Sequence, residues 1–344
     1  MKIAVGLSGG VDSTTTLILL KNQGYDVVGI TMKTYNPNNP LRDKLANSTS
    51  CYGSDKLKDI DTCKSICAKH DIPYHVIDVS AEFSVEVMNY FTSEYNAGRT
   101  PNPCVMCNDK IKFGVFLDKV FKSGIEFDYF ATGHYARIKR CGDKSFVCKA
   151  LDSKKDQSYF LSKLSPFILN KVMFPLGEYT KEQTRKMAAD FGLETADKKD
   201  SQDFIGTGYK ILFPSIPGDI IDTTGKILGR HVGITNYTIG QRKGINVGST
   251  TPLFVKEIDS VNNRIVVATE AEIFSSSLKM NKFFFSPITN DPIYAKIRQN
   301  HTPILSSVVG DEIVFSIPQK GVTPGQIVAL YQNNIVIGSG TIER

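Results

Sequence analysis

The residues best suited to chemistry lie near the N-terminus, in the turn 8–15, which reads Ser-Gly-Gly-Val-Asp-Ser-Thr-Thr. The apolar run 3–7 before it predicts a buried strand, and residues 16–21 after it predict a helix. Two glycines let an anion approach the backbone, and the helix N-terminus presents unpaired N–H groups and the positive end of its dipole. We therefore predict a phosphate-binding turn in which Asp12 holds a magnesium ion; an ordinary capped turn is the alternative.

The second group of reactive residues is the Cys-x-x-Cys spacing of Cys104 and Cys107 within residues 100–108. Two prolines predict an extended loop, and Asn108 or Asp109 is a good N-cap for a helix that begins there. A thiol just before a helix start feels the positive end of the dipole, which lowers its pKa and favours the thiolate. This segment therefore predicts reactive sulfur.

The chemistry of this cysteine pair stays open on spacing alone. Such a pair fits a redox dithiol, half of a zinc site or ligands of an iron–sulfur cluster, and Lys110 and Lys112 add positive charge nearby. A zinc site needs a second pair of ligands. Cys63 and Cys67 have helical spacing, which favours a structural helix face over a ligand pair.

Length and composition describe a globular chain of two or three domains, since 344 residues exceed one ordinary core. The net charge of +6 permits a nucleic-acid partner without establishing one. Seven cysteines, an odd number, favour reduced thiols over a disulfide framework. The sequence shows no secretory leader and no apolar run of membrane-spanning length, so we expect a cytoplasmic protein with no membrane partner.

The first two hundred residues alternate apolar runs with helical patterns, which predicts an α/β fold with a doubly wound parallel sheet. Expected strands are 3–7, 26–32, 75–79 and 128–132, and expected helices are about 14–22, 55–70, 81–97, 108–122 and 180–191. Beyond residue 203, short segments broken by Gly, Pro and Asn predict small β-barrels, at 219–223, 235–239, 253–258, 264–268, 281–285, 294–297, 312–317, 327–331 and 334–337. The domains expected are 1–203, 204–273 and 274–344.

Ligands of open α/β sheets bind beyond the carboxyl ends of the strands. This rule places residues 8–13 around one crevice with Met32, Gly133 and His134. Met32 ends a strand where an adenine ring could lie, and plain core packing is an equal alternative for it.

The turn at 8–13 resembles the PP-loop signature of ATP-dependent adenylating enzymes, which release pyrophosphate and leave AMP on the substrate. Further matches in the same order make the chain similar, over essentially its whole length, to the tRNA-specific 2-thiouridylase family. They lie at residues 100–108, 131–136, 155–161, 237–244 and 323–326.

The resemblance implies a PP-loop adenylation domain, a small central β domain and a C-terminal β-barrel. It implies that ATP adenylates O2 of the wobble uridine (U34) in the anticodon stem-loop of tRNA and that cysteine-borne sulfur or sulfide attacks C2. The target base must leave its stack to be reached. The implied cofactors are ATP and Mg²⁺, with an iron–sulfur cluster as an alternative, and the partners are tRNA and a sulfur-donor protein or sulfide.

The resemblance also implies roles for individual residues. The nucleophile falls on Cys107, with Cys104 as the second residue of the catalytic pair or, together with Cys107, as a cluster ligand. ATP-binding positions are Gly6, Leu7, Ser8, Gly9, Gly10, Val11, Asp12, Ser13, Met32 and Gly133. tRNA-binding positions are Asn102, Pro103, Cys104, His134, Lys155, Asp156, Gln157, Arg298, Gln299 and Gln326.

One departure from the family affects the mechanism. Family members carry a further cysteine in a motif like Asp-Ser-Gln-[Asp/Glu]-Ile-Cys-Phe-Ile, whereas residues 200–206 read Asp-Ser-Gln-Asp-Phe-Ile-Gly and no cysteine follows Cys148. Three accounts remain: Cys104 and Cys107 form a self-sufficient pair, they hold a cluster with other ligands, or the chain binds tRNA without thiolating it. Cys51 resembles a cysteine-rich family stretch, although a structural thiol is favoured there, and Cys141 and Cys148 flank an expected hairpin tip.

Two other functions compete with thiolation. A small-molecule PP-loop ligase, such as an argininosuccinate-synthase-like enzyme, needs neither the cysteine loop nor the β-barrel. A tRNA-binding homologue with impaired thiolation is motivated by the missing cysteine.

Overall fold

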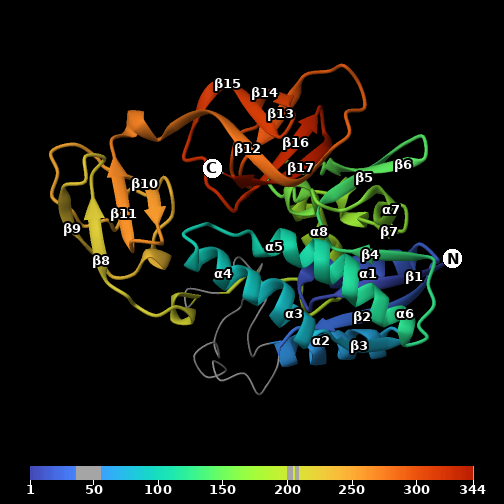
Figure 1. The fold of residues 1–344 in the computed structure, drawn as a ribbon. Helices are drawn as coiled ribbons and strands as arrows, with labels where there is room; N and C mark the ends of the chain where they lie inside the picture. Colours follow the sequence, from blue (N-terminus) through green and yellow to red (C-terminus); the bar gives the residue numbers. More distant parts are fainter. Residues whose placement is uncertain (36–55, 200–203, 206–208, 344) are drawn as a thin grey trace. The chain divides into compact units, whose positions relative to one another are not determined.

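The computed structural model describes residues 1–35, 56–199, 204–205 and 209–343, and the chain divides into two compact units (Figure 1). We call the first the PP-loop unit; it contains Met1–Val87, Cys104–Gly208 and Asn334–Val336. We call the second the β unit; it contains Met88–Pro103, Tyr209–Asn333 and Ile337–Arg344.

The PP-loop unit contains a five-stranded sheet in the order β3-β2-β1-β4-β7, and every neighbouring pair is parallel. This confirms the predicted doubly wound α/β fold. The two-residue β7 was not predicted, because so short a segment carries no periodicity. The strands are β1 (Lys2–Leu7), β2 (Asp26–Lys33), β3 (Tyr74–Asp78), β4 (Tyr129–Thr132) and β7 (Val172–Met173).

Helices pack on both faces of this sheet. Ile3, Val5 and Leu7 of β1 share one buried cluster with apolar residues of α1, α2 and α8. Gly6 faces the other way, where Phe130 contacts Phe113 and Phe116. The helices are α1 (Val11–Asn22), α2 (Lys56–Lys69), α3 (Ser80–Phe83), η1 (Ser84–Asn89), α5 (Pro103–Met106), η2 (Cys107–Val115), α6 (Phe116–Lys122), η3 (Ser158–Leu161), α7 (Pro166–Leu169), η4 (Pro175–Glu178) and α8 (Lys181–Asp190).

The predicted hairpin is present in the PP-loop unit as β5 (Ala136–Cys141) and β6 (Lys144–Lys149). Its tip contains Gly142, whose φ of 62° suits a glycine. Cys141 and Cys148 flank the tip as expected, and Ile335 pairs with Cys148 on the far side of β6.

The β unit contains a four-stranded sheet in the order β10-β11-β8-β9, and begins with helix α4 (Tyr90–Asn96). The strand predicted at 235–239 is wrong: the short helix η6 (Ile234–Asn236) lies there, between Gly233 and Gly240, which both have positive φ. Its apolar residues still pack into the core of this sheet. The remaining elements are η5 (Tyr209–Leu212), β8 (Gly218–Ile221), β9 (Ile227–His231), β10 (Phe254–Asp259), β11 (Arg264–Ala268) and η7 (Glu270–Ile273).

Six further strands of the β unit follow one another in the order β12-β15-β14-β13-β16-β17, and β12 pairs with β17 to close them into a barrel. The predicted C-terminal β-barrel is therefore confirmed. β14 was not predicted, although the exposure of its residues alternates, as expected for a strand with one face toward the barrel interior. The strands are β12 (Phe274–Phe285), β13 (Ile293–Lys296), β14 (Ile304–Val309), β15 (Glu312–Lys320), β16 (Ile327–Gln332) and β17 (Ile335–Glu343).

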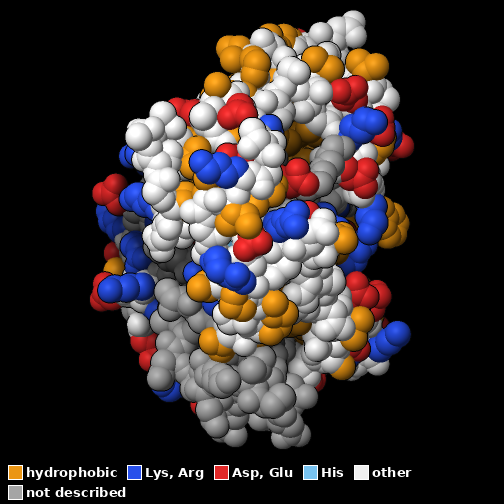
Figure 2. All heavy atoms as spheres, turned by 60° about the vertical axis from the view of Figure 1, so that its left-hand side comes forward, with side chains coloured by type: hydrophobic (Ala, Val, Ile, Leu, Met, Phe, Trp, Pro, Cys, Tyr) orange, Lys and Arg blue, Asp and Glu red, His pale blue; other side chains and the backbone are white. Residues whose placement is uncertain are grey.

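Figure 2 shows a face on which Lys and Arg side chains lie among Asp and Glu side chains, without one continuous basic patch. This mixture agrees with the modest net charge of +6. Within the described ranges, no helix combines the length and apolar character needed to cross a membrane.

Replacing Gly177 by alanine is expected to destabilise the PP-loop unit. An added Cβ would lie 1.8 Å from the carbonyl oxygen of Ala136, so backbone must move. We expect the free energy of unfolding to fall by about 2 kcal/mol or more. Gly248→Ala is the control, because a Cβ there meets nothing within 4 Å. Equal urea midpoints for the two variants would contradict the close contact.

Candidate functional site

The PP-loop connects β1 to α1 at the carboxyl edge of the sheet. Gly9 has a φ of 75° and Gly10 is the N-cap of α1, which has no side-chain cap. The Ser13 hydroxyl instead accepts from the Ser8 N–H at 3.1 Å and donates to the Gly10 carbonyl at 3.1 Å. These hydrogen bonds lie within the loop, and no side chain caps the first amides of α1. Those N–H groups can therefore donate to an anion.

Gly133 packs directly on the start of α1. A Cβ at this position would lie 2.7 Å from the Asp12 carbonyl carbon and 2.8 Å from the Ser13 nitrogen. β1 and β4 pair in parallel with Gly6 opposite Thr132, so the segments after both strands leave the sheet side by side. Met32 lies half-buried near the end of β2, next to β1. The structure thus brings together the ATP-binding positions predicted from three separate segments.

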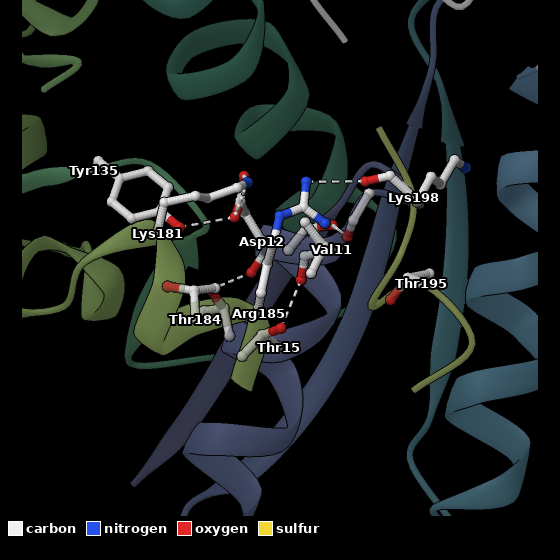
Figure 3. A network of polar contacts seen from close by, with 12 residues as sticks. Val11, Asp12, Thr15, Tyr135, Lys181, Thr184, Arg185, Thr195 and Lys198 are labelled. Atoms are coloured by element: carbon white, nitrogen blue, oxygen red, sulfur yellow. Dashed lines mark hydrogen bonds and ion pairs between the residues drawn. The ribbon is translucent and has the colours of Figure 1, made fainter. Parts of the chain in front are cut away.

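Asp12 is held by two side chains from distant segments (Figure 3). The Lys181 ammonium lies 2.7 and 2.8 Å from its two carboxylate oxygens, and the Tyr135 hydroxyl donates to Oδ1 at 2.9 Å. Lys181 is the first residue of α8, and Thr180 and Gln183 form a capping box that fixes this helix start. The predicted metal ligand is therefore paired with an ammonium in this structure.

A second lysine contacts the PP-loop from the segment 195–198. Lys198 donates to the Gly9 carbonyl at 2.9 Å and pairs with Asp59 at 2.5 Å. The Thr195 and Thr14 hydroxyls lie 2.7 Å apart, so the segment is also tied to α1. Arg185 of α8 donates to carbonyls of the same segment, as Figure 3 shows. Two cations are thus fixed around the loop.

The cysteine pair lies differently from the prediction. The helix begins at Pro103 and not at Asn108, because proline is favoured at the first helical position, where no N–H bond is lost. Cys107 therefore lies inside a helical run and not before it, whereas Cys104 stays in the first turn. Residues three apart share a helix face, so both half-buried thiols face the same side.

The segment after Cys107 is a π-helix, η2, whose regular geometry is interrupted at Gly114. Such wide turns occur frequently at functional sites. Asn108 is buried and donates to the Phe160 carbonyl at 3.0 Å, which fastens the cysteine helix to η3.

The residues just before η3 are the predicted tRNA-contacting residues 155–157. Lys155 is exposed, whereas Asp156 is buried and accepts from the Ala150 and Ser158 amides at 3.0 and 3.2 Å. Gln157 accepts from the Tyr135 amide at 2.9 Å. Two of these residues thus hold the loop, and the third presents its charge to solvent.

In the β unit, the structure joins two predicted tRNA positions that lie 224 residues apart. Asn102 donates to the Gln326 side chain at 3.3 Å, and the Thr100 amide donates to the Pro324 carbonyl at 2.9 Å. Pro103 follows Asn102 directly. Arg298 is exposed and Gln299 half-buried in the loop after β13.

His134 lies half-buried directly after Gly133. Its Nδ1 is 2.7 Å from the Thr132 hydroxyl and its Nε2 is 3.4 Å from the Lys112 ammonium. The aromatic rings of Phe113 and Phe174 pack against the imidazole ring of His134. Burial, followed by the charge of Lys112, holds the pKa of His134 well below its usual range, so the imidazole is neutral.

Three further described cysteines, Cys63, Cys67 and Cys148, are buried. Burial raises the pKa of Cys63 to about 11 and that of Cys67 to about 12, and both thiols pack in the cluster beneath α1. Burial likewise raises the pKa of Cys148 to about 11. Cys51 lies outside the described residues. Among the residues that are described, no group of three or more His, Cys, Asp or Glu side chains could hold a metal.

Sequence reasoning missed the roles of Lys181 and Lys198. The capping box at Thr180 marks a helix start, but the pairing of Lys181 with Asp12 spans 169 residues and leaves no local signal. The sequence predicts Lys112 only as a positive charge near the thiols, because its contact with His134 depends on the tertiary fold.

Comparison with known proteins covers nearly the whole chain. Residues 1–206 match the model of the tRNA methyl transferase HUP domain, 208–269 its PRC-barrel domain and 293–342 the aminomethyltransferase β-barrel domain. The chain is 42% identical over 357 residues to the tRNA-specific 2-thiouridylase MnmA of Endomicrobium trichonymphae, covering 99% of each chain. It is 41% identical to the protein of that name from Lachnoclostridium phytofermentans, covering 99% of each, and 38% identical to that of Carboxydothermus hydrogenoformans, covering 100% of this chain and 98% of the relative.

His134 is expected to make stability fall in acid. The pKa of His134 is lower in the folded chain than in the unfolded chain, where it is about 6.5. Below that pH the proton binds His134 in the unfolded chain and not in the folded one, which favours unfolding. This one group should cost up to about 1.4 kcal/mol between pH 7.5 and 5.5. Urea unfolding of the wild type and of His134→Gln at both pH values isolates the effect. The same pH dependence in both proteins would show that His134 titrates normally.

Proposed function

Because this chain belongs to the tRNA-specific 2-thiouridylase family, we propose that it catalyses ATP-dependent 2-thiolation of the wobble uridine (U34) of tRNA. One observation carries the proposal: the uncapped N-terminus of α1 and two thiols on one helix face belong to the same compact unit. The first suits activation by a nucleotide, and the second suits delivery of sulfur.

The PP-loop supports the activation step. Amides of α1 bind the pyrophosphate part of ATP, and Lys181 and Lys198 supply positive charge beside it. O2 of the uracil attacks the α-phosphorus while the bond to the β-phosphate oxygen breaks, and pyrophosphate leaves with that electron pair. With AMP attached, O2 becomes part of a good leaving group, so C2 is more electrophilic and sulfur can attack it.

Magnesium fits this loop in part. Mg²⁺ is usually held by one or two carboxylates together with substrate phosphates, and Asp12 is the carboxylate at the required position. Its oxygens are bound to Lys181, so the ion would take Asp12 when the ammonium turns to phosphate. When bound, the ion would neutralise charge on the phosphates.

An iron–sulfur cluster fits less well. A cluster takes four thiolates as a rule, and the described residues offer Cys104 and Cys107 on one helix face. Within those residues no third ligand completes a metal-binding group. We derive no step through a cluster and propose that the two thiols act as a pair, with a persulfide on Cys107 that takes its outer sulfur from the persulfide of a donor protein. Sulfide, as the alternative source, attacks C2 directly.

We propose that tRNA binds through the predicted positions in both units. Lys155 presents its charge from the loop that Asp156 and Gln157 hold in place. Asn102 with Pro103 lies against the target base, and Gln326 orients Asn102. Further contacts to the anticodon stem-loop come from Cys104, His134, Arg298 and Gln299.

We propose domain boundaries near residues 203 and 273. We also propose that the protein acts in the cytoplasm, where its tRNA substrate is found. The second candidate function is a tRNA-binding homologue without thiolation, since no cysteine follows Cys148. The small-molecule ligase is not favoured, because the matched family models include both β-domains.

The decisive experiment is anaerobic thiolation of unmodified tRNA with ATP, magnesium and a persulfide-bearing sulfur-donor protein, read out by nucleoside mass spectrometry. We expect 2-thiouridine from the wild type and at least a hundredfold less from Cys107→Ser and from Cys104→Ser. Cys141→Ser is the matched control and should retain activity. tRNA binding by the wild type with neither pyrophosphate release nor thiouridine would favour the second candidate.

Gly133→Ala is expected to weaken ATP binding by about tenfold or more. Its Cβ would push on the backbone of Asp12 and Ser13, which displaces the start of α1 from the geometry that phosphate needs. Calorimetric titration of ATP into the variant and into Gly248→Ala gives the comparison. Unchanged ATP affinity in Gly133→Ala would place the phosphates elsewhere.

A further inference from the structure

Lys112 and His134 form an unusual contact of two groups that can both carry positive charge. The Lys112 Nζ lies 3.4 Å from His134 Nε2, and an ammonium can only donate, so Nε2 accepts. The proton of the neutral ring then sits on Nδ1 and is donated to the Thr132 hydroxyl at 2.7 Å. The ring is thereby fixed in a state that holds the ammonium in place.

Lys112 differs from the other lysines of the site because no carboxylate among the described residues pairs with it. Lys181 pairs with Asp12 and Lys198 with Asp59, and Lys110 on the same helix pairs with Asp109 at 3.1 Å. No ion pair joins Lys112 to an acidic side chain in the described ranges. A half-buried ammonium held against a neutral ring leaves positive charge uncompensated, which suits an anion that arrives with the substrate.

The position of this ammonium lies between the two chemical parts of the PP-loop unit. Gly133, which packs on the start of α1, is the residue before His134. Cys107 precedes Lys112 by five residues in η2, and the i to i+5 bonding of a π-helix places such residues one turn apart on one side. An anion bound here lies beyond the PP-loop, toward the thiols.

We propose that Lys112 is a catalytic residue that binds the α-phosphate, first of ATP and then of the adenylated uridine, and that His134 positions it. The inference rests on the proposed function and deepens it. Pyrophosphate leaves with the electrons of the α–β bridging bond, and AMP later leaves with O2 and the electrons of its bond to C2. The ammonium neutralises the charge that the α-phosphoryl oxygens carry while O2 attacks, and it stabilises the further negative charge that they gain when AMP leaves.

The first test compares two anions that separate the α-phosphate site from the PP-loop. AMP carries only the α-phosphate, whereas inorganic pyrophosphate occupies the PP-loop. We expect Lys112→Met to weaken AMP binding by about ten- to a hundredfold and to leave pyrophosphate binding unchanged. Lys110→Met, exposed on the same helix, should change neither affinity. Equal loss for both anions, loss of neither, or a wild type that binds neither would overturn the assignment.

The second test measures single-turnover pyrophosphate release with saturating tRNA. We expect Lys112→Met to slow release by about a hundred- to a thousandfold while the Kd for tRNA stays within threefold. Lys112→Arg should recover most of the rate, and His134→Gln, which keeps an acceptor, should lie between them. A parallel loss of tRNA affinity would make Lys112 a tRNA contact instead.

The two proposals fail in distinguishable ways. A wild type that releases no pyrophosphate with tRNA refutes the proposed function, while AMP and pyrophosphate affinities still decide the role of Lys112. Circular dichroism checks that the variants fold, and Lys112→Gln replaces the methionine variant if that one does not.

Discussion

The site depends on the parallel pairing of β1 with β4, which sets Gly6 opposite Thr132. This register makes the PP-loop and Gly133 leave the sheet together, although more than a hundred residues separate them in sequence. The segments approach so closely that a Cβ on Gly133 would overlap the backbone of Asp12 and Ser13. A Cβ added to Gly9 would lie equally close to Asp59. Glycine at these turns is therefore required by the lack of space as well as by the backbone conformation.

Charge at this edge is arranged in two ways. Lys181 and Lys198 are each compensated by a carboxylate, Asp12 and Asp59, so the ammonium groups are oriented before any ligand binds. In the proposed function, a polyphosphate would compete for those ammonium groups with several charges at once, and the exchange would free carboxylates that suit a divalent ion. Lys112 is oriented by a neutral imidazole instead, which demands no such exchange. The site therefore has two regions: at Lys181 and Lys198 the ammonium groups are already in ion pairs, whereas at Lys112 the positive charge has no carboxylate partner among the described residues.

Sequence patterns anticipated what is local. The strand–turn–helix at residues 1–22 follows from an apolar run and a glycine turn, and the rule for carboxyl ends of parallel strands placed Gly133 beside it. The cysteine helix began earlier than expected, because Pro103 was interpreted as a loop residue although proline is equally favoured in a first helical turn. The strand expected at 235–239 failed because alternating apolar residues also serve irregular backbone between two glycines. Contacts such as that of Lys181 with Asp12 depend on tertiary packing and leave no periodicity to detect.

Because no cysteine follows Cys148, the thiol chemistry of the proposed function depends on Cys104 and Cys107. Burial has raised the pKa values of Cys63, Cys67 and Cys148 far from the range in which a thiolate forms readily. Thiols three residues apart at a helix start have Cα atoms within the separation that a disulfide spans, and only the first turn must adjust. When the outer sulfur of a persulfide on Cys107 attacks C2 and displaces AMP, the product is a C2–S–S–Cys107 linkage. Attack of the Cys104 thiolate on the Cys107 sulfur breaks that S–S bond, leaves the outer sulfur on C2 with the electron pair, and forms a Cys104–Cys107 disulfide that a reductant must reopen. Cys104 is thus the described thiol best placed to take over the role of the absent one, and the helix start at Pro103 is the feature that lets it do so.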